Sequence, residues 1–260
     1  MPDISSQKIL VDWNSEIQKA GIKAWCVDRC GSTMDLARTH AEDLSIGELG
    51  LVIAREQSSG RGRRGNKWLI ANGAFTGTWI FPTNLAPEQV SGLSLVVGLA
   101  VKRVINDLGG QVKLKWPNDV LTTKGEKISG LLIEALPKND LVVMLIGLGV
   151  NLVSKPELAQ TSSVYEVTNQ NIPPDKFGRM VSEKLKELLA DFSVGGFASF
   201  QSEWERDAAF IGEKISFEYD GAKRQGKMLG VNKSGHLLVE LDGRELNLVA
   251  GDVAHVRSYS

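Results

Sequence analysis

Residues 60–68, with the sequence GRGRRGNKW, constrain the fold more than any other part of the chain. Their three glycines let the backbone bend to positive φ and approach a ligand closely, and arginine forks pair with carboxylate or phosphate oxygens. The apolar runs 51–54 and 75–81 on either side predict two strands. The segment is therefore expected to be a loop that joins two strands and closes over an anion.

The remaining periodicity predicts an α+β protein built around a mixed sheet. Apolar residues recur at helical spacing in 91–108 and 175–192, which predicts two long helices. Ser32, three residues ahead of Asp35, resembles a capping box that opens a further helix toward His40. Further strands are expected at 24–27, 112–115, 128–135 and 141–150.

Beyond about residue 210 the pattern changes to short strands. The dipeptides Asp220-Gly221 and Asp242-Gly243 separate them and are typical of two-residue hairpin turns. We expect a domain boundary in 208–212, with a main domain of residues 1–210 and a small β-barrel-like domain of residues 211–260. The short strands are expected at 214–219, 224–229, 236–241 and 245–249.

The charge balance makes the cationic loop conspicuous. The chain has 30 Lys+Arg against 31 Asp+Glu, a formal net charge of −1, so it has no general attraction to nucleic acid or anionic lipid. The longest apolar run, 141–150, is too short to cross a bilayer, and residues 1–6 lack a basic region followed by an apolar one. The sequence therefore predicts a cytoplasmic protein without a membrane partner.

The two cysteines carry no recognisable chemistry. Cys26 and Cys30 match neither a redox Cys-x-x-Cys motif nor zinc-ligand spacing, and no dedicated metal-ligand cluster is evident. We expect both thiols to be reduced and buried.

Three known glycine loops are similar to residues 60–68 but fail in context. The spacing Gly60-x-Gly62-x-x-Gly65 matches a dinucleotide-binding motif, but that motif opens a helix, and here a strand follows. A Walker loop would continue with lysine and a hydroxyl residue, and a kinase loop would need His-Arg-Asp and Asp-Phe-Gly downstream. A solvated basic turn remains the simplest alternative for this segment alone.

Three downstream motifs argue against that simple alternative. They are KWPND at 115–119, in which proline fixes a turn, KISG at 127–130, and GLGVN at 147–151, whose glycines indicate a bulge or a close approach by a ligand. Together with Ser32-Thr33, Gln57 and the loop, in this order, they resemble the biotin protein ligase family, over about residues 32–151.

The resemblance implies a fold and a type of enzyme. The family fold is a mixed-sheet α+β catalytic domain, related to class II synthetases and lipoyl ligases, with a C-terminal SH3-like barrel. Only 31 residues precede Ser32, so we expect a monofunctional enzyme without an N-terminal DNA-binding domain.

The implied reaction is biotin–[acetyl-CoA-carboxylase] ligation in two steps. The biotin carboxylate attacks the α-phosphorus of ATP, giving biotinyl-5′-AMP and pyrophosphate; a lysine of a biotin carboxyl carrier domain then attacks the mixed anhydride. Positioned cations and alignment would supply most of the catalysis. Mg²⁺ would enter with ATP, and a homodimer is a further expectation of the resemblance.

The resemblance also implies roles for individual residues. Lys127 and Arg63 would be catalytic and would contact both substrates. The biotin site would comprise Ser32, Thr33, Gln57, Gly60, Arg61, Arg63, Lys127 and Gly130. The nucleotide site would comprise Arg63, Trp68, Asn118, Lys127 and Asn151.

Two positions depart from the family pattern, and two other functions are alternatives for the sequence. Met34 stands where the family usually has asparagine, and Asn66 where a basic residue is common.

The first alternative function is that of a lipoyl-type ligase, which would share the fold, but whose loop places arginines ahead of a glycine run. A nucleic-acid-binding module would use the loop cations, but the net charge of −1 and the lack of interleaved aromatic residues argue against it.

Overall fold

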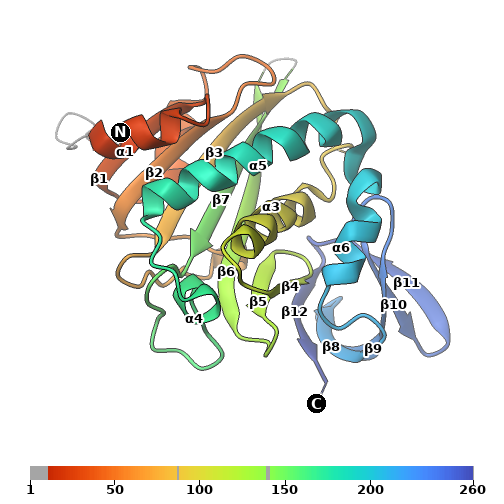
Figure 1. Ribbon diagram of the computed structural model, residues 1–260. Helices are drawn as coiled ribbons and strands as arrows, with labels where there is room; N and C mark the ends of the chain where they lie inside the picture. Colours follow the sequence, from red (N-terminus) through yellow and green to blue (C-terminus); the bar gives the residue numbers. More distant parts are fainter. Residues whose placement is uncertain (1–10, 87, 139–140, 260) are drawn as a thin grey trace.

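The computed structural model describes residues 11–86, 88–138 and 141–259. They form a seven-stranded mixed sheet with helices on both faces and a separate five-stranded antiparallel sheet (Figure 1). The larger sheet has the order β1-β2-β3-β7-β6-β5-β4. Its strands are β1 (Lys23–Cys30), β2 (Gly50–Gln57), β3 (Phe75–Thr83), β4 (Val112–Lys115), β5 (Asp119–Thr122), β6 (Lys127–Lys138) and β7 (Leu141–Val150). This arrangement confirms the predicted α+β class.

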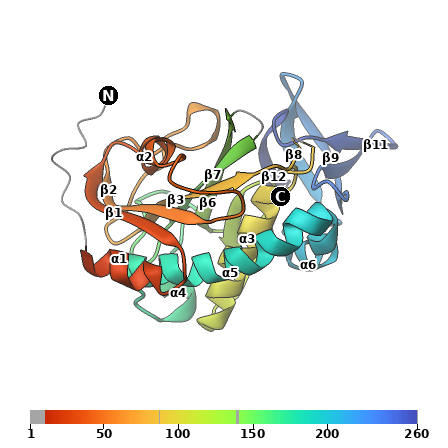
Figure 2. The ribbon, with the colours of Figure 1, turned by 90° about the horizontal axis from the view of Figure 1, so that it is seen from above.

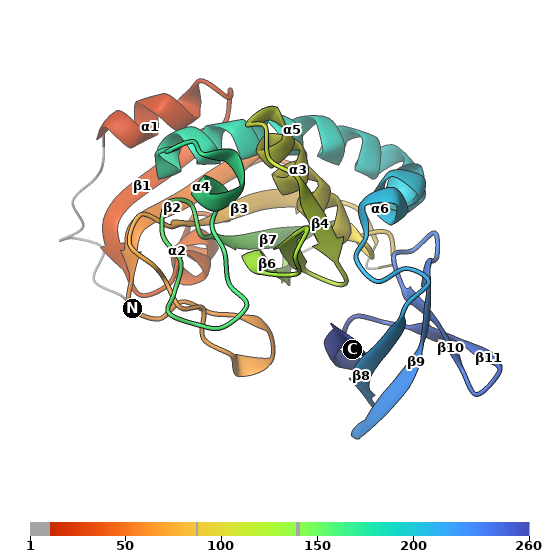
Figure 3. The same ribbon diagram turned by 60° about the horizontal axis from the view of Figure 1, so that its bottom comes forward.

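The helices form two layers of unequal size. Strands β1 and β2 are parallel because helix α2 connects them, and every other pair in this sheet is antiparallel. Helix α2 lies on one face, and α1, α3 and α5 cover the other (Figures 2 and 3). The helices are α1 (Val11–Gln18), α2 (Thr33–Thr39), α3 (Leu93–Asp107), α4 (Val164–Thr168), α5 (Pro174–Gly195) and α6 (Gln201–Asp207).

The main core lies under α3 and α5. The buried faces of these helices pack on Phe75, Trp79 and Ile146 of the sheet, and the Trp79 indole N–H donates to Ser182 Oγ at 2.8 Å. The two long helices predicted at 91–108 and 175–192 are confirmed. Within the described residues, no helix is both long enough and apolar enough to cross a bilayer.

Several details differ from the sequence-based expectations. The capping box is wrong: Ser32 caps α2 by accepting the Met34 N–H at 3.3 Å, but the Asp35 carboxylate pairs with Arg61 instead of returning to Ser32. The Asp35 carboxylate pairs with Arg61 because a hydrogen bond from a charged guanidinium is stronger than one from the neutral Ser32 amide. Strand β5 begins at Asp119, so the turn at 115–119 belongs to a β4–β5 hairpin. The helices α4 and α6 were also not predicted.

The C-terminal sheet has the order β11-β10-β9-β8-β12. Both expected hairpin turns are confirmed, because Asp220-Gly221 and Asp242-Gly243 have positive φ at both positions. The sequence missed the last strand, β12, which pairs with β8. The strands are β8 (Lys214–Tyr219), β9 (Ala222–Val231), β10 (Leu237–Leu241), β11 (Arg244–Leu248) and β12 (Val253–Ser258).

The two sheets are joined by specific contacts. The buried Trp116 indole N–H donates to the Gly235 carbonyl at 3.0 Å, and the Ser91 hydroxyl donates to the Ser234 carbonyl at 2.8 Å. Gly235 also packs against the backbone of Gly92 at the start of α3. These contacts bring β12 beside the face of the larger sheet that carries α2.

Candidate functional site

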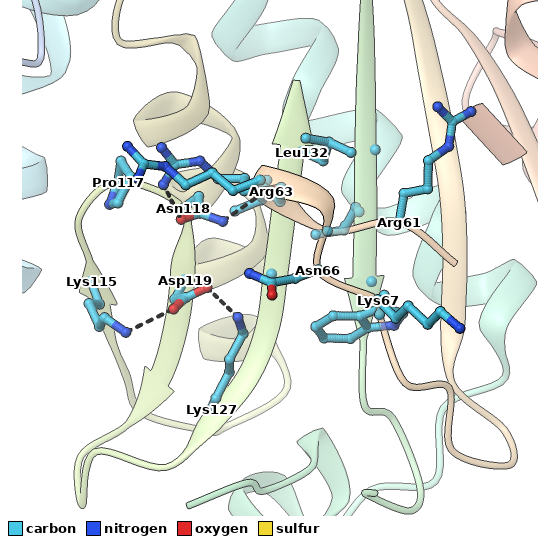
Figure 4. Close-up of a pocket in the computed structure, with 18 of the residues that line it drawn as sticks. Arg61, Arg63, Asn66, Lys67, Lys115, Pro117, Asn118, Asp119, Lys127 and Leu132 are labelled. Atoms are coloured by element: carbon cyan, nitrogen blue, oxygen red, sulfur yellow. Dashed lines mark hydrogen bonds and ion pairs between the residues drawn. The ribbon is translucent and has the colours of Figure 1, made fainter. Parts of the chain in front are cut away.

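A cavity of about 490 Å³ opens on the α2 face of the large sheet. Its walls come from the start of α2, the 60–68 loop, the β4–β5 turn and β12, and its base is formed by β3, β6 and β7. Figure 4 shows some of the side chains that line it. The cavity therefore collects segments from nearly the full length of the described chain.

The base of the cavity is a glycine floor of Gly130, Gly147 and Gly149. The register pairs Gly130 with Gly149. At each of the three positions, the lack of a side chain leaves room on the strand surface at the base of the cavity. A Cβ on Gly149 would overlap the Trp68 indole, and one on Gly147 would lie 2.8 Å from Met34 Sδ. Pairing is continuous along β6 and β7, so these glycines permit close approach and do not form a bulge.

One end of the cavity presents neutral hydrogen-bonding groups. The Thr33 N–H donates to Gln57 Oε1 at 2.7 Å, which fixes the orientation of the Gln57 amide. The Thr78 hydroxyl donates to Thr33 Oγ1 at 2.9 Å. Thr76 lies beside them on β3, and Ser32 and Thr33 are both buried. This end suits a compact polar group with both donors and acceptors.

The other end is dominated by charge. Asp119 lies between two lysines, with Oδ2 at 2.9 Å from Lys115 Nζ and Oδ1 at 2.5 Å from Lys127 Nζ (Figure 4). Burial alone would raise the pKa of the Asp119 carboxyl, but Lys127 and Lys115 outweigh burial and hold the pKa below its ordinary value. The carboxylate therefore stays ionised and fixes both ammonium groups in place.

Arg63 belongs to the cationic end, where it lies beside the β4–β5 turn and reaches the C-terminal sheet. It donates to Asn118 Oδ1 at 3.2 Å and to the Ala250 carbonyl, while the Asn118 amide donates to the Leu131 carbonyl at 2.8 Å. Burial and the neighbouring Arg64 lower the pKa of Arg63, and Asp119 opposes that shift. Burial makes this guanidinium a strong partner for an anion, because little water competes with it.

The other loop cations have different partners. Arg64 donates to the Gly251 carbonyl at 2.8 Å, and Arg61 pairs with Asp35 on α2. Lys127 Nζ also lies 5.6 Å from the centre of the Trp68 ring, within the range of a cation–π contact. The indole N–H of Trp68 is buried without a hydrogen-bond partner. The loop is thus held at several points around the cavity.

Most residues predicted for the site line this one cavity. They are Ser32, Thr33, Gln57, Arg61, Arg63, Trp68, Asn118, Lys127 and Gly130. Gly60 and Asn151 do not line it. The Gly60 carbonyl accepts the Trp68 N–H at 3.0 Å and so shapes the loop, and the buried Asn151 amide donates to the Ser162 carbonyl at 3.0 Å.

Sequence reasoning missed other lining residues. Lys115 and Asp119 belong to the KWPND motif, so their spacing at a turn could have indicated a site. Thr76 on β3, and His255 and Arg257 on β12, carried no comparable signal because nothing local distinguishes these positions. The two departures from the family pattern, Met34 and Asn66, both line the cavity.

Cys26 and Cys30 take no part in the site. Both are buried free thiols, as expected. Burial raises the pKa of each thiol to about 12, with smaller contributions from Asp175 at Cys26 and from Asp35 at Cys30. Neither thiol can be a nucleophile near neutral pH.

Comparison with known proteins places the chain in a family. Residues 27–151 match the model of the biotin/lipoate A/B protein ligase family. The chain is 32% identical over 219 residues to the bifunctional ligase/repressor BirA of Escherichia coli, covering 80% of this chain and 68% of that protein. It is 31% identical over 199 residues to the biotin–[acetyl-CoA-carboxylase] ligase of Paracoccus denitrificans, covering 72% and 82%. The chain therefore belongs to the biotin/lipoate A/B protein ligase family.

Comparison with solved structures gives a similarity over nearly the whole chain. The biotin protein ligase of Aquifex aeolicus, solved in complex with biotin and ATP, superposes with a TM-score of 0.75 at 25% identity, covering 90% of this chain and 98% of that one. The Paracoccus denitrificans and Aquifex aeolicus proteins are both biotin ligases by name, and the chain is similar to each over most of its length.

Proposed function

We propose that this protein forms biotinyl-5′-AMP from biotin and ATP and then transfers biotin to a lysine of a biotin carboxyl carrier domain. The observation that carries the proposal is that one cavity holds both the neutral hydrogen-bonding groups around Thr33 and Gln57 and a cationic end with Lys127 and Arg63. Biotin has a polar ureido head and a carboxylate tail, and ATP presents phosphate anions. Each end of the cavity therefore suits one part of the two substrates.

The neutral end would hold the biotin head. Ser32, Thr33 and Gln57 would bind the ureido group, and the glycine floor with Met34 would take the apolar ring. Gly130 would contribute through its lack of a side chain, which lets Trp68 and Lys127 pack directly against the strand beside the ring. Arg61 would contribute to this end from the start of the loop, and Gly60 would act through the shape of the loop.

The cationic end would hold the reacting phosphate. Arg63 would bridge the biotin carboxylate and the α-phosphate, and Lys127 would neutralise the same phosphate during attack. Asp119 supports this role because it holds the Lys127 ammonium at 2.5 Å in a fixed place. Asn118 would face the phosphates, since its side chain is already oriented by Leu131 and Arg63.

The adenosine would lie beside the indole of Trp68. A flat aromatic face over glycines suits a stacked base. Asn151 is proposed to reach the base or ribose through its Oδ1, which is buried without a hydrogen-bond partner. The Asn151 side chain does not line the cavity, so this role requires a rearrangement when the nucleotide binds.

Mg²⁺ is proposed to enter with the triphosphate. Among the described residues there is no group of three or more histidine, cysteine or acidic side chains that could hold a metal ion. Asp119 is already engaged by two lysines. The phosphate oxygens themselves would therefore supply most of the ligands.

The wider setting is also a proposal. We assign residues 1–210 to the catalytic domain and residues 211–260 to an SH3-like domain, since α6 ends at Asp207 and β8 begins at Lys214. A reaction that consumes ATP favours the cytoplasm. A homodimer, and the lack of a nucleic-acid or membrane partner, stay expectations.

The direct test is a transfer assay. The protein is incubated with MgATP, radiolabelled biotin and a carrier domain, and label on the acceptor lysine is measured by mass spectrometry. We expect one labelled lysine and pyrophosphate release that depends on biotin. A competition arm with lipoate distinguishes the lipoyl-type alternative: preferential lipoylation, or no transfer from folded protein, would refute the proposal.

A further inference from the structure

His255 on strand β12 has an unusual backbone conformation. Its φ is +52°, in the left-handed region that side chains other than glycine rarely adopt. The other non-glycine residues with positive φ in the described chain lie in turns, loops or at helix ends, whereas His255 lies within a strand. Such a conformation has a free-energy cost, and strained residues of this kind are enriched at functional sites.

The pairing register shows that His255 belongs to a bulge. Ala254 pairs with Glu218 and Arg257 with Ser216, so three steps along β12 match two steps along β8. One extra residue is therefore inserted in β12. Bulges of this kind turn a side chain toward a new direction, and they are common beside active sites.

The bulge lies in the cavity wall. Residues 253–257 all line the cavity, but Val253, Ala254 and Val256 are buried apolar residues of the core. The His255 side chain is 54% exposed, and its Nε2 lies 3.8 Å from Glu218 Oε2, too far for a hydrogen bond. The imidazole therefore has donor capacity free for a ligand.

The position of β12 indicates which part of the substrates the His255 imidazole would contact. The turn immediately before β12 accepts hydrogen bonds from Arg63 and Arg64, so the strand adjoins the cationic end. The neutral end at Thr33 and Gln57 lies on α2 and β2, and β12 pairs with neither. In the proposed function, a polar group at this wall would face the phosphates rather than the biotin head.

We propose that His255 binds the β- or γ-phosphate of ATP, donating a hydrogen bond from its imidazole. The inference rests on the proposed function, because that function puts the triphosphate at this end. The contact would be made with ATP and with the departing pyrophosphate, and it would be lost in biotinyl-5′-AMP, which lacks both phosphates. The C-terminal sheet would thus contribute to the binding of ATP before the first step, and not to the binding of biotinyl-5′-AMP after it.

The test deletes the side chain without straining the backbone. Glycine adopts positive φ freely, so His255→Gly should fold at least as well as the wild type. Asp242→Gly is the matched control, because Asp242 has φ +51° in a hairpin turn and does not line the cavity. The measurements are kcat and KM for ATP, pyrophosphate inhibition, and the Kd of biotin and of biotinyl-5′-AMP by calorimetry.

For His255→Gly we expect KM for ATP and the inhibition constant of pyrophosphate to rise roughly tenfold, as for loss of one hydrogen bond to a charged group. The Kd values for biotin and biotinyl-5′-AMP should be unchanged, and Asp242→Gly should match the wild type throughout. Unchanged KM for ATP, or weaker binding of biotinyl-5′-AMP, would overturn the inference. Wild-type protein that forms no adenylate would instead count against the proposed function.

Discussion

Asp119 and its two lysines show how a single buried carboxylate organises the cationic end. The carboxylate is held ionised by Lys115 and Lys127, since its pKa lies below the ordinary value despite burial. It therefore fixes the Lys127 ammonium without neutralising the whole site, where Arg63 adds a further positive charge. A positioned ammonium costs no reorganisation when charge develops on the phosphate.

At this scale we predict that Lys127→Ala blocks the first step. Biotin-dependent pyrophosphate release should fall by about 100-fold or more, as when a transition-state charge contact is removed, while biotin binding weakens only modestly. Lys124→Ala is the control, because Lys124 is exposed and does not line the cavity. Pyrophosphate release near the wild-type rate in Lys127→Ala would show that the assigned role is wrong.

At the scale of elements, the 60–68 loop depends on partners from three directions. Arg61 pairs with α2, Arg63 reaches the β4–β5 turn, and both Arg63 and Arg64 reach the C-terminal sheet. Within the loop, the backbone is stabilised only by an antiparallel β-bridge between Arg61 and Lys67 and by a short 3-10 turn. The loop can therefore exchange partners when an anionic ligand arrives.

We predict that the loop becomes ordered over biotinyl-5′-AMP. Limited trypsin digestion should cleave at residues 61–67 in the free protein, and biotin with MgATP should protect these bonds, because the closed loop excludes water from the anhydride. Cleavage after the exposed Arg224 on β9 serves as the internal reference. If cleavage in the loop is unchanged by both substrates, it does not act as a lid.

At the scale of the whole molecule, the C-terminal sheet completes the cavity. Its β12 lines one wall, and its place is set by the contacts of Gly235 with Trp116 and Gly92. A Cβ on Gly235 would lie 2.8 Å from the Gly92 Cα, which is closer than packed atoms approach. Docking of the two sheets and formation of the site are therefore linked.

We predict that Gly235→Ala loosens this docking. The free energy of unfolding in urea should fall by about 1–3 kcal/mol more than in Gly221→Ala, because the two glycines share positive φ but only Gly235 meets a neighbour. KM for ATP should rise in Gly235→Ala alone. Equal stability of the two variants would mean that the contact between the sheets is not tightly packed.

Local sequence predicted most elements and many of the residues that line the cavity. The long helices, the hairpin turns and the strands around 60–68 follow from periodicity and turn chemistry, which act over a few residues. Short elements such as β5 and β12 were missed because their stability comes from pairing with distant strands. The capping-box prediction failed for the same reason, since Asp35 pairs with Arg61 from a distant loop.

The sequence by itself determined the order of the cations, glycines and amides, and with it the resemblance to the biotin protein ligases. Only the tertiary structure decided how these residues meet. It joined Arg63 to Ala250, 187 residues away, put His255 into the cavity wall, and left Gly60 and Asn151 outside the lining. Contacts over such separations depend on the packing of two sheets, and no local pattern records them.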